Sequence, residues 1–258
     1  MINNSKASNQ TLYAAQEQFI KLLNNATQDK ETLGREVVLC GGTALARCYL
    51  DHRISYDLDF FVDGTFDPEL LAIKLGKQGI HLNDVQIENS GQFVHQLFGF
   101  TNIDGVQLKV SFIEDSYAGM FPRAAIPFGD TEFNIECVEG LYHRKLRTVS
   151  GSGYGDRPLD GRQTARDLFD LYMLDLAVKP MPEFIAEINQ AGANFPEKAF
   201  MSGLASMPWI AMMDDFEQLD FNAMNPHLIN LQPENIMAMV RARTQEVFKE
   251  MAHYGKTI

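Results

Sequence analysis

The stretch Leu39–Phe61 reads LCGGTALARCYLDHRISYDLDFF, and it carries the strongest fold signal of the chain. An apolar run, Glu36–Cys40, predicts a short strand that enters it. This strand runs directly into Gly41–Thr43, and Ala44–Leu50 is predicted to be helical. A second strand is predicted over Tyr56–Val62. The stretch therefore combines a glycine turn at the end of one strand with an acidic strand that follows it.

Asp57 and Asp59 are expected on one face of this second strand, because successive side chains of a strand alternate between its faces. Leu58, Phe60 and Phe61 give the strand an apolar side as well. Two neighbouring carboxylates are costly unless a hard cation lies between them, and magnesium prefers oxygen ligands. Asp57 and Asp59 are therefore predicted magnesium ligands. The alternative interpretation is a solvated strand edge.

The glycine turn suits phosphate binding. Gly41 and Gly42 would let the backbone approach a phosphate closely, and the helix after Thr43 would offer free N–H groups at its positive end. Magnesium held by carboxylates and triphosphate oxygens recurs in nucleotidyl transfer. Gly41, Gly42 and Thr43 are therefore candidate phosphate contacts. An ordinary turn with Thr43 as a helix cap is the alternative, and both interpretations can hold at once.

The remaining pattern predicts a mixed α/β half, residues 1–138, followed by a helical half, residues 139–258. Helices are expected at residues 10–26, 68–77, 139–149, 163–178, 182–190 and 233–253, and further strands at 85–88, 92–100, 106–114 and 131–138. Ile103-Asp104-Gly105 reads as a hairpin turn. In the strand after it, Leu108, Val110 and Phe112 alternate with Lys109 and Ser111, so one face is expected to be buried.

The stretch Leu39–Phe61 resembles the first motif of the nucleotidyltransferase AbiEii/AbiGii toxin family, which belongs to the polymerase-β-like nucleotidyltransferase superfamily. Three further motifs of this family have counterparts in the same order. Its aliphatic-x-Gly-aliphatic element is similar to Ile103–Val106. Its lysine motif is similar to Lys145 with Ser150, and its final Asp-x-x-Asp resembles Asp167–Asp170.

The resemblance implies an α+β fold, with a mixed sheet of the polymerase-β nucleotidyltransferase type and a helical C-terminal half. It implies a magnesium-dependent enzyme that transfers a nucleotide from a nucleoside triphosphate to RNA, tRNA or protein. The enzyme would be the toxin of a toxin–antitoxin or abortive-infection system, restrained by a cognate antitoxin. Both halves are expected to contribute to one site, with Asp57 and Asp59 from the first half and Lys145 and Asp167 from the second.

Individual roles follow from the same resemblance, and two of them have a plainer alternative. Lys145 would reach the triphosphate, or it is a solvated helix lysine. Asp167 would accept the proton of the attacking group. Asp170 is a substrate-binding candidate, although an ion pair with Arg166 one helical turn earlier would also explain it.

The segment before the acidic strand adds two further candidates. Arg53 and Ser55 would orient the substrate or brace the strand that carries Asp57, and bracing is the favoured role for Ser55. His52 is interpreted as structural.

Two positions depart from the expected pattern. The superfamily places a third carboxylate on a neighbouring strand, where this chain has Ser111, with Glu114 only at the strand's end. The lysine motif of the family ends in an arginine, where this chain has Ser152. These serines favour an alternative of another class, a non-catalytic module that binds a nucleotide or a partner.

Composition limits the classes of partner and compartment. The formal net charge is −12, which argues against a general nucleic-acid binder because such affinity depends on basic contacts to phosphates. Three cysteines without metal-binding spacing, a polar start and the lack of a long apolar run predict a cytoplasmic protein with no membrane span. The glycine-rich segment Ser150–Gly161 is expected to be a loop that becomes ordered when substrate binds.

Overall fold

The computed structural model describes residues 2–28, 35–89, 94–150, 164–229 and 232–254. The expected substrate-ordered loop therefore lies outside the described residues from position 151 onward. The chain divides into two compact units. The first comprises Met1–Tyr49 and Ile54–Gly140, and the second comprises Leu50–Arg53 and Leu141–Ile258. The short segment Leu50–Arg53 thus belongs to the helical unit, although it lies in the first half of the sequence.

A mixed seven-stranded sheet forms the first unit, in the order β3-β4-β5-β2-β1-β7-β6. Its strands are β1 (Val37–Cys40), β2 (Leu58–Asp63), β3 (Asn83–Glu88), β4 (Gln96–Ile103), β5 (Val106–Asp115), β6 (Arg123–Phe128) and β7 (Thr131–Glu136). The pairs β1–β7 and β2–β5 are parallel, and the other neighbours are antiparallel. The predicted α+β class with a mixed sheet is confirmed.

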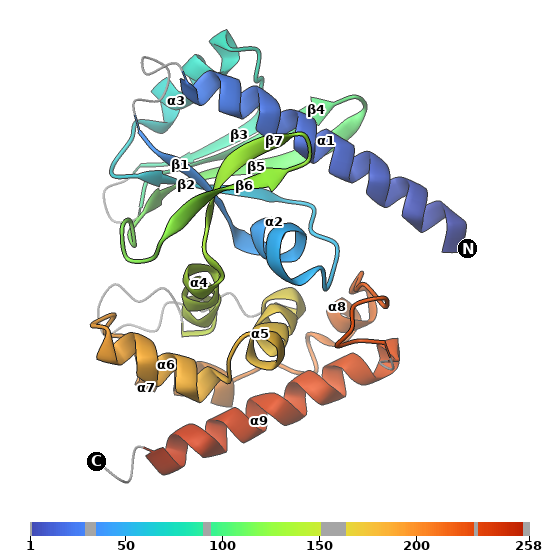
Figure 1. The fold of residues 1–258 in the computed structure, drawn as a ribbon, viewed down its shortest axis with the longest axis vertical. Coiled ribbons are helices and arrows are strands. Elements are labelled where there is room, and N and C mark those ends of the chain that lie inside the picture. The colour runs from blue at the N-terminus through green and yellow to red at the C-terminus, as the bar shows by residue number, and fades with distance from the viewer. Residues whose placement is uncertain (1, 29–34, 90–93, 151–163, 230–231, 255–258) are drawn as a thin grey trace. The chain divides into compact units, whose positions relative to one another are not determined.

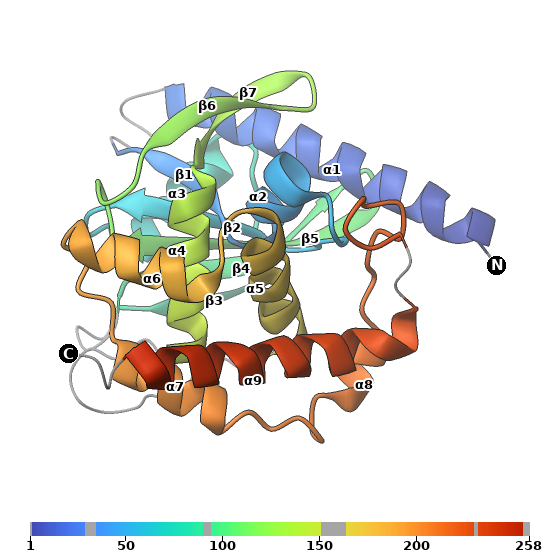
Figure 2. The same ribbon diagram turned by 60° about the horizontal axis from the view of Figure 1, so that its bottom comes forward.

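One face of this sheet packs against the N-terminal helix α1 (Ile2–Gln28), which crosses it in Figures 1 and 2. Phe60 of β2 is fully buried and lies between Phe19 of α1, at a ring distance of 5.9 Å, and Phe112 of β5, at 5.2 Å. Phe133 of β7 meets the same ring edge-on. Burying aromatic rings contributes much of the packing energy of a small sheet. The opposite face of the central strands remains available for polar side chains.

The acidic strand differs from its prediction in two respects. It begins at Leu58, so Asp57 directly precedes β2. Its core face consists of Leu58, Phe60 and Val62, whereas Phe61 lies on the face that carries Asp59. The prediction that placed Phe61 on the core face was wrong, because residues i and i+2 of a strand share a face and residue i+1 does not.

Local turn chemistry was predictable. Helix α3 (Pro68–Lys77) begins after Asp67, whose carboxylate accepts a hydrogen bond of 3.0 Å from the N–H of Leu70. The turn between β4 and β5 lies at Asp104 and Gly105, both with positive φ, which is the geometry of a tight hairpin. The helix after the glycine turn is irregular: α2 (Gly41–Ala44) continues into the π-helical η1 (Leu45–Leu50).

The second unit is helical. It contains most of α4 (Val138–Ser150), together with α5 (Ala165–Ala177), α6 (Met181–Gln190), α7 (Glu197–Ala205), α8 (Met213–Glu217), the 3-10 turn η2 (Pro233–Asn235) and α9 (Ile236–Tyr254). The long helix α9 contacts α5, α6, α7 and α8, and Figure 2 shows it passing alongside them. No helix in the described ranges is long and apolar enough to cross a membrane.

Candidate active site

The glycine turn and the acidic strand meet in the first unit. Strand β1 ends at Cys40 and α2 starts at Gly41, whose φ of +69° is a conformation that side-chain-bearing residues rarely adopt. A Cβ atom at Gly41 would lie 2.5 Å from Oδ2 of Asp59, closer than real contacts allow. Glycine is thus required here for two reasons, the backbone conformation and the close approach to the carboxylate. Asp59 therefore lies directly against the glycine turn.

Asp59 lies in a row of residues that crosses the sheet. It is paired with Cys40 on β1 and with Ser111 on β5, and Ser111 is paired with Phe98 on β4. Paired residues share a face, so the Ser111 side chain lies beside Asp59 on the same face of the sheet. Ser111 is nearly buried, with 9% of its surface exposed.

Asp57 is partly accessible, with 31% of its side chain exposed. Its carboxylate lies 3.9 Å from the ammonium of Lys109 on β5. Its backbone carbonyl accepts a hydrogen bond from the hydroxyl of Thr43. That hydroxyl therefore fixes the backbone that presents Asp57, and any contact of Thr43 with a phosphate would use its N–H.

These side chains fit magnesium only as part of a larger ligand set. Asp57 and Asp59 supply oxygen donors beside a turn without side chains, and magnesium commonly takes one or two carboxylates together with substrate phosphates and water. Within the described residues, no three His, Cys, Asp or Glu side chains are grouped so that they could hold a metal ion.

A second polar group lies inside the helical unit and is centred on Asp170 of α5. Its fully buried carboxylate accepts hydrogen bonds from Nε and Nη2 of Arg53, at 2.6 and 2.8 Å, and from Nε2 of His52, at 2.7 Å. Nζ of Lys145, on α4, lies 2.7 Å from Oδ2 of Asp170 and 2.6 Å from Oδ1 of Asp167. We refer to His52, Arg53, Lys145, Asp167 and Asp170 as the Asp170 cluster.

Charge balance decides the protonation of this cluster. Burial would raise the pKa of Asp170, but Arg53 and Lys145 outweigh it and hold this pKa well below its usual range. Burial would lower the pKa of Lys145, but Asp167 and Asp170 raise it above its ordinary value. Burial lowers the pKa of His52. The Asp170 carboxylate is therefore an anion between the cations Arg53 and Lys145, and the His52 imidazole beside it is neutral.

The structure places the predicted residues in two groups. Gly41, Gly42, Thr43, Asp57 and Asp59 lie together in the first unit. Arg53, Lys145, Asp167 and Asp170 lie together in the second. Lys145 is 8% exposed, so the alternative of a solvated lysine is wrong.

Two other predicted residues take part in hydrogen bonds within the protein. Arg53 uses two nitrogens on Asp170, and Ser55, which is buried in the first unit, accepts a hydrogen bond of 2.8 Å from Gln16 at its carbonyl. His52 was set aside as structural, and its contact with Asp170 could not be found from spacing because 118 positions separate the two residues.

Another buried histidine of the helical unit makes stability depend on pH. Burial, with Arg147 and Arg144 nearby, lowers the pKa of His143 from 6.5 to about 4. Between these values the unfolded chain binds a proton that the folded chain does not. We therefore expect the free energy of unfolding to fall as pH falls from 6.5 to 4, by up to about 1.4 kcal/mol per pH unit. Urea denaturation across this range measures the slope.

The control for this prediction is a histidine on the surface. His143→Gln should flatten the dependence on pH, whereas His227→Gln, at an exposed position, should keep the wild-type slope. If both variants retain the same slope as the wild type, His143 is not the group responsible.

The chain was compared with known proteins. A search of curated proteins found no match. Two solved structures resemble the chain. JHP933 from Helicobacter pylori has 20% sequence identity and a TM-score of 0.47, and the match covers 94% of this chain and 96% of that chain. An antigenic nucleotidyltransferase-like protein from Paracoccidioides brasiliensis has 13% identity and a TM-score of 0.41, and the match covers 72% of this chain and 92% of that chain. The sequence model of a family described as nucleotidyl transferase AbiEii toxin, type IV toxin–antitoxin system, matches residues 26–242. This match covers most of the chain and confirms the resemblance found in its motifs: the chain belongs to the AbiEii family of nucleotidyltransferase toxins.

Proposed function

We propose that this nucleotidyltransferase is a cytoplasmic, magnesium-dependent enzyme that transfers a nucleotide from a nucleoside triphosphate to an acceptor. The observation that carries the proposal is the contact of Gly41 with Asp59, which puts a backbone turn suited to phosphate directly against a candidate metal ligand. Asp57 and Asp59 would hold the metal. A magnesium ion held there would supply positive charge to the triphosphate. The acceptor oxygen forms a bond to the α-phosphorus, and the bond between that phosphorus and the pyrophosphate leaving group breaks.

The residues of the chain have separate tasks in this proposal. The N–H groups of the Gly41–Thr43 turn bind phosphate oxygens, and Thr43 keeps Asp57 in place through its carbonyl. Lys145 contributes a point charge to the triphosphate. Asp167 accepts the proton of the acceptor hydroxyl, for which it must exchange its ion pair with Lys145. Arg53 and His52 hold Asp170, which in turn fixes the position of the Lys145 ammonium.

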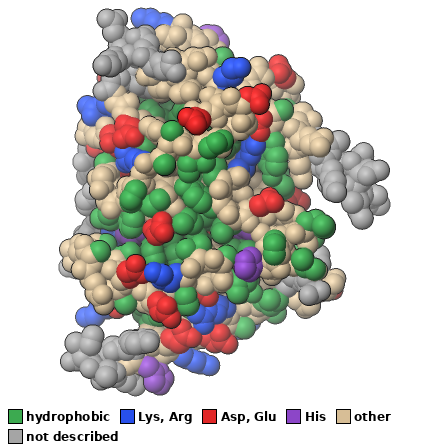
Figure 3. All heavy atoms as spheres, in the orientation of Figure 1, with side chains coloured by type: hydrophobic (Ala, Val, Ile, Leu, Met, Phe, Trp, Pro, Cys, Tyr) green, Lys and Arg blue, Asp and Glu red, His purple; other side chains and the backbone are tan. Residues whose placement is uncertain are grey.

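The acceptor in this proposal is RNA, tRNA or a protein hydroxyl, and the partner that restrains the enzyme is a cognate antitoxin. The acidic net charge favours acceptors that need few phosphate contacts, such as a protein hydroxyl or the end of one RNA strand. Figure 3 agrees with this preference: among the described residues on that face, Lys and Arg side chains are interrupted by acidic ones and form no continuous basic band.

A non-catalytic nucleotide- or partner-binding module is the competing function. Ser111 favours it, because this hydroxyl lies beside Asp59 where a third carboxylate would otherwise complete the metal site. The two functions differ in what the protein does with a labelled triphosphate. The enzyme transfers the labelled nucleotide to RNA or protein, whereas the binding module only retains it.

Magnesium and a nucleoside triphosphate together should raise the melting temperature. A ligand present at about 100 times its Kd stabilises the native state by roughly 2.7 kcal/mol, which is on the order of 5 °C or more for a chain of this size. The double substitution Asp57→Asn and Asp59→Asn should abolish this shift while leaving the ligand-free protein folded. Differential scanning fluorimetry with each of the four triphosphates, with and without magnesium, measures it.

The matched control removes two carboxylates elsewhere in the same unit. Asp130→Asn with Glu132→Gln alters exposed positions around the β6–β7 turn and should keep the full shift. An unchanged magnesium-dependent shift in the Asp57/Asp59 variant would refute the metal assignment.

A further inference from the structure

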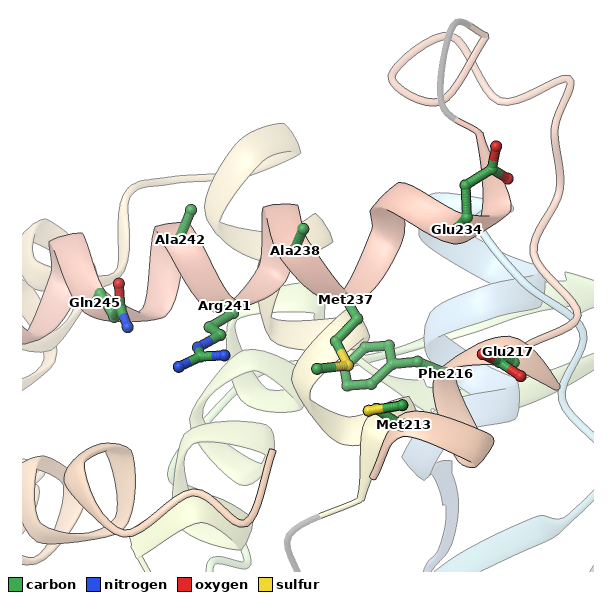
Figure 4. A pocket seen from close by; sticks show the side chains of 9 residues that line it. All are labelled: Met213, Phe216, Glu217, Glu234, Met237, Ala238, Arg241, Ala242 and Gln245. Atoms are coloured by element: carbon green, nitrogen blue, oxygen red, sulfur yellow. The ribbon is translucent and has the colours of Figure 1, made fainter. Parts of the chain in front are cut away.

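A groove in the helical unit, away from the Asp170 cluster, is open and apolar at its centre. It has a volume of about 430 Å³ and lies between α8 and α9. Figure 4 shows Met213 and Phe216 of α8 facing Met237 of α9, with the side chains of Glu217 and Glu234 close to one end. We refer to this feature as the α8–α9 groove.

The side of α9 that lines the α8–α9 groove carries small side chains. Ala238 and Ala242 are one helical turn apart and exposed. Their short side chains leave room for a partner along this face of α9. Met213 on the other wall is 45% exposed. Methionine side chains are flexible and polarizable, and they adapt to apolar partners of different shape. An exposed apolar groove of this kind commonly marks a binding surface for another protein.

The polar margin of the groove is acidic. Glu217 and Glu234 line it, and Asp214 and Asp215 lie on the same short helix α8 and are exposed. In the described part of the chain, these four carboxylates form no ion pair. Arg241 is the basic residue that lines the groove, and its guanidinium lies over the ring of Trp209 at 5.9 Å. The margin therefore has an excess of negative charge.

From this combination we propose that the α8–α9 groove binds an amphipathic helix of a protein partner, with apolar anchors on one face and Lys or Arg beside them. Methyl-rich anchors would pack on Met213, Phe216 and Met237, and the basic residues would meet the acidic margin. A second copy of this chain would bring a second acidic margin against the first, and nucleic acid would bring phosphates, so like charges disfavour both occupants.

The fluorescence of a tryptophan beside the α8–α9 groove can report its occupancy. The single tryptophan of the chain, Trp209, is half-buried and stacks on Phe216 at a ring distance of 6.5 Å. A helix seated on Phe216 and displacing Arg241 would change the surroundings of this indole. The emission of Trp209 should therefore report occupancy when the partner peptide contains no tryptophan.

The test uses the full chain and a designed probe. The probe is a peptide of about 15 residues made of leucine and lysine, with the leucines on one helical face, and the control peptide has the same composition with the leucines dispersed. At about 0.15 M salt, the amphipathic peptide should shift Trp209 emission saturably. The dispersed peptide should bind at least about tenfold more weakly, a difference of roughly 1.4 kcal/mol.

Two groove variants and matched controls complete the experiment. Ala238→Gln with Ala242→Gln fills the groove without changing charge, and Glu217→Gln with Glu234→Gln neutralises its margin. Each should weaken peptide binding by about tenfold or more. The controls are Ala186→Gln, on exposed helix surface of α6, and Glu69→Gln with Glu183→Gln, which remove the same charge elsewhere. These controls should bind like the wild type.

Several results would overturn the proposal. Equal binding of both peptides, or undiminished binding by the filled groove, would show that the acidic surface attracts lysine without using the groove. A dimer seen by sedimentation velocity, and lost in the Ala238/Ala242 variant, would assign the groove to a second copy of the chain instead.

Discussion

Replacement of Lys145 by alanine is expected to reduce the transfer of label from a nucleoside triphosphate by about 10²–10³. In the proposed reaction this ammonium meets charge that develops on the triphosphate in the transition state, and alanine supplies none. The assay incubates the protein with each triphosphate, labelled at the α-phosphate, together with total RNA or lysate protein. Incorporated label then gives the relative rate.

A loss of folding must be separated from this loss of rate, because Lys145 also pairs with the buried Asp167 and Asp170. Arg243→Ala is the matched control: it removes a cation from another nearly buried carboxylate of α5, that of Asp175, at 2.7 Å. This variant should lose stability yet keep its activity below its melting temperature. Undiminished transfer by Lys145→Ala would remove Lys145 from the site, and a complete lack of transfer by the wild type would favour the binding module.

The largest effect on stability is expected from Asp170→Asn. The amide is neutral, so Arg53 and Lys145 would lose the buried charge that compensates them. Removing one partner of a buried ion pair typically costs about 3–5 kcal/mol. Thermal or urea denaturation at pH 7 measures the loss.

The pH and a surface control test this explanation. The pKa of Asp170 is depressed in the folded state, so its contribution is present above the ordinary aspartate value of 3.8 and is lost as pH falls below it. Asp130→Asn, at an exposed turn, should change stability by less than about 0.5 kcal/mol. A loss of that small size for Asp170→Asn as well would mean that the cluster contributes little to folding.

The sequence allowed most regular elements to be predicted, because their signals are local. The Asp67 cap, the Asp104-Gly105 hairpin and the apolar alternation of β5 each involve neighbouring residues. Strand β6 (Arg123–Phe128) was not predicted. It contains Pro127 at the edge of the sheet, where the strand pairs with β7 alone, and such edge strands carry weak patterns.

The contacts of the candidate site were less predictable for a physical reason. Gly41 and Asp59 could be brought together from their motif, because one strand–helix–strand unit contains both. The partners of Asp170 come from positions more than a hundred residues away and from another helix, and nothing local in α5 distinguishes Arg53 from Arg166 as its cation. Charge pairing of this kind depends on tertiary packing, which a single sequence does not display.

The four-residue segment Leu50–Arg53 has a consequence for how this protein is made. It is held in the helical unit by Asn222, whose N–H donates to the carbonyl of His52 at 2.8 Å, and by Asn225. During synthesis, Arg53 leaves the ribosome long before Asp170, so the buried charges of the helical unit cannot pair until the chain has been translated past residue 170. A fragment beginning at Leu141 would carry Asp170 and Lys145 without the guanidinium. Gene fusions or split versions of this toxin would therefore have to keep residues 50–53 together with the C-terminal half.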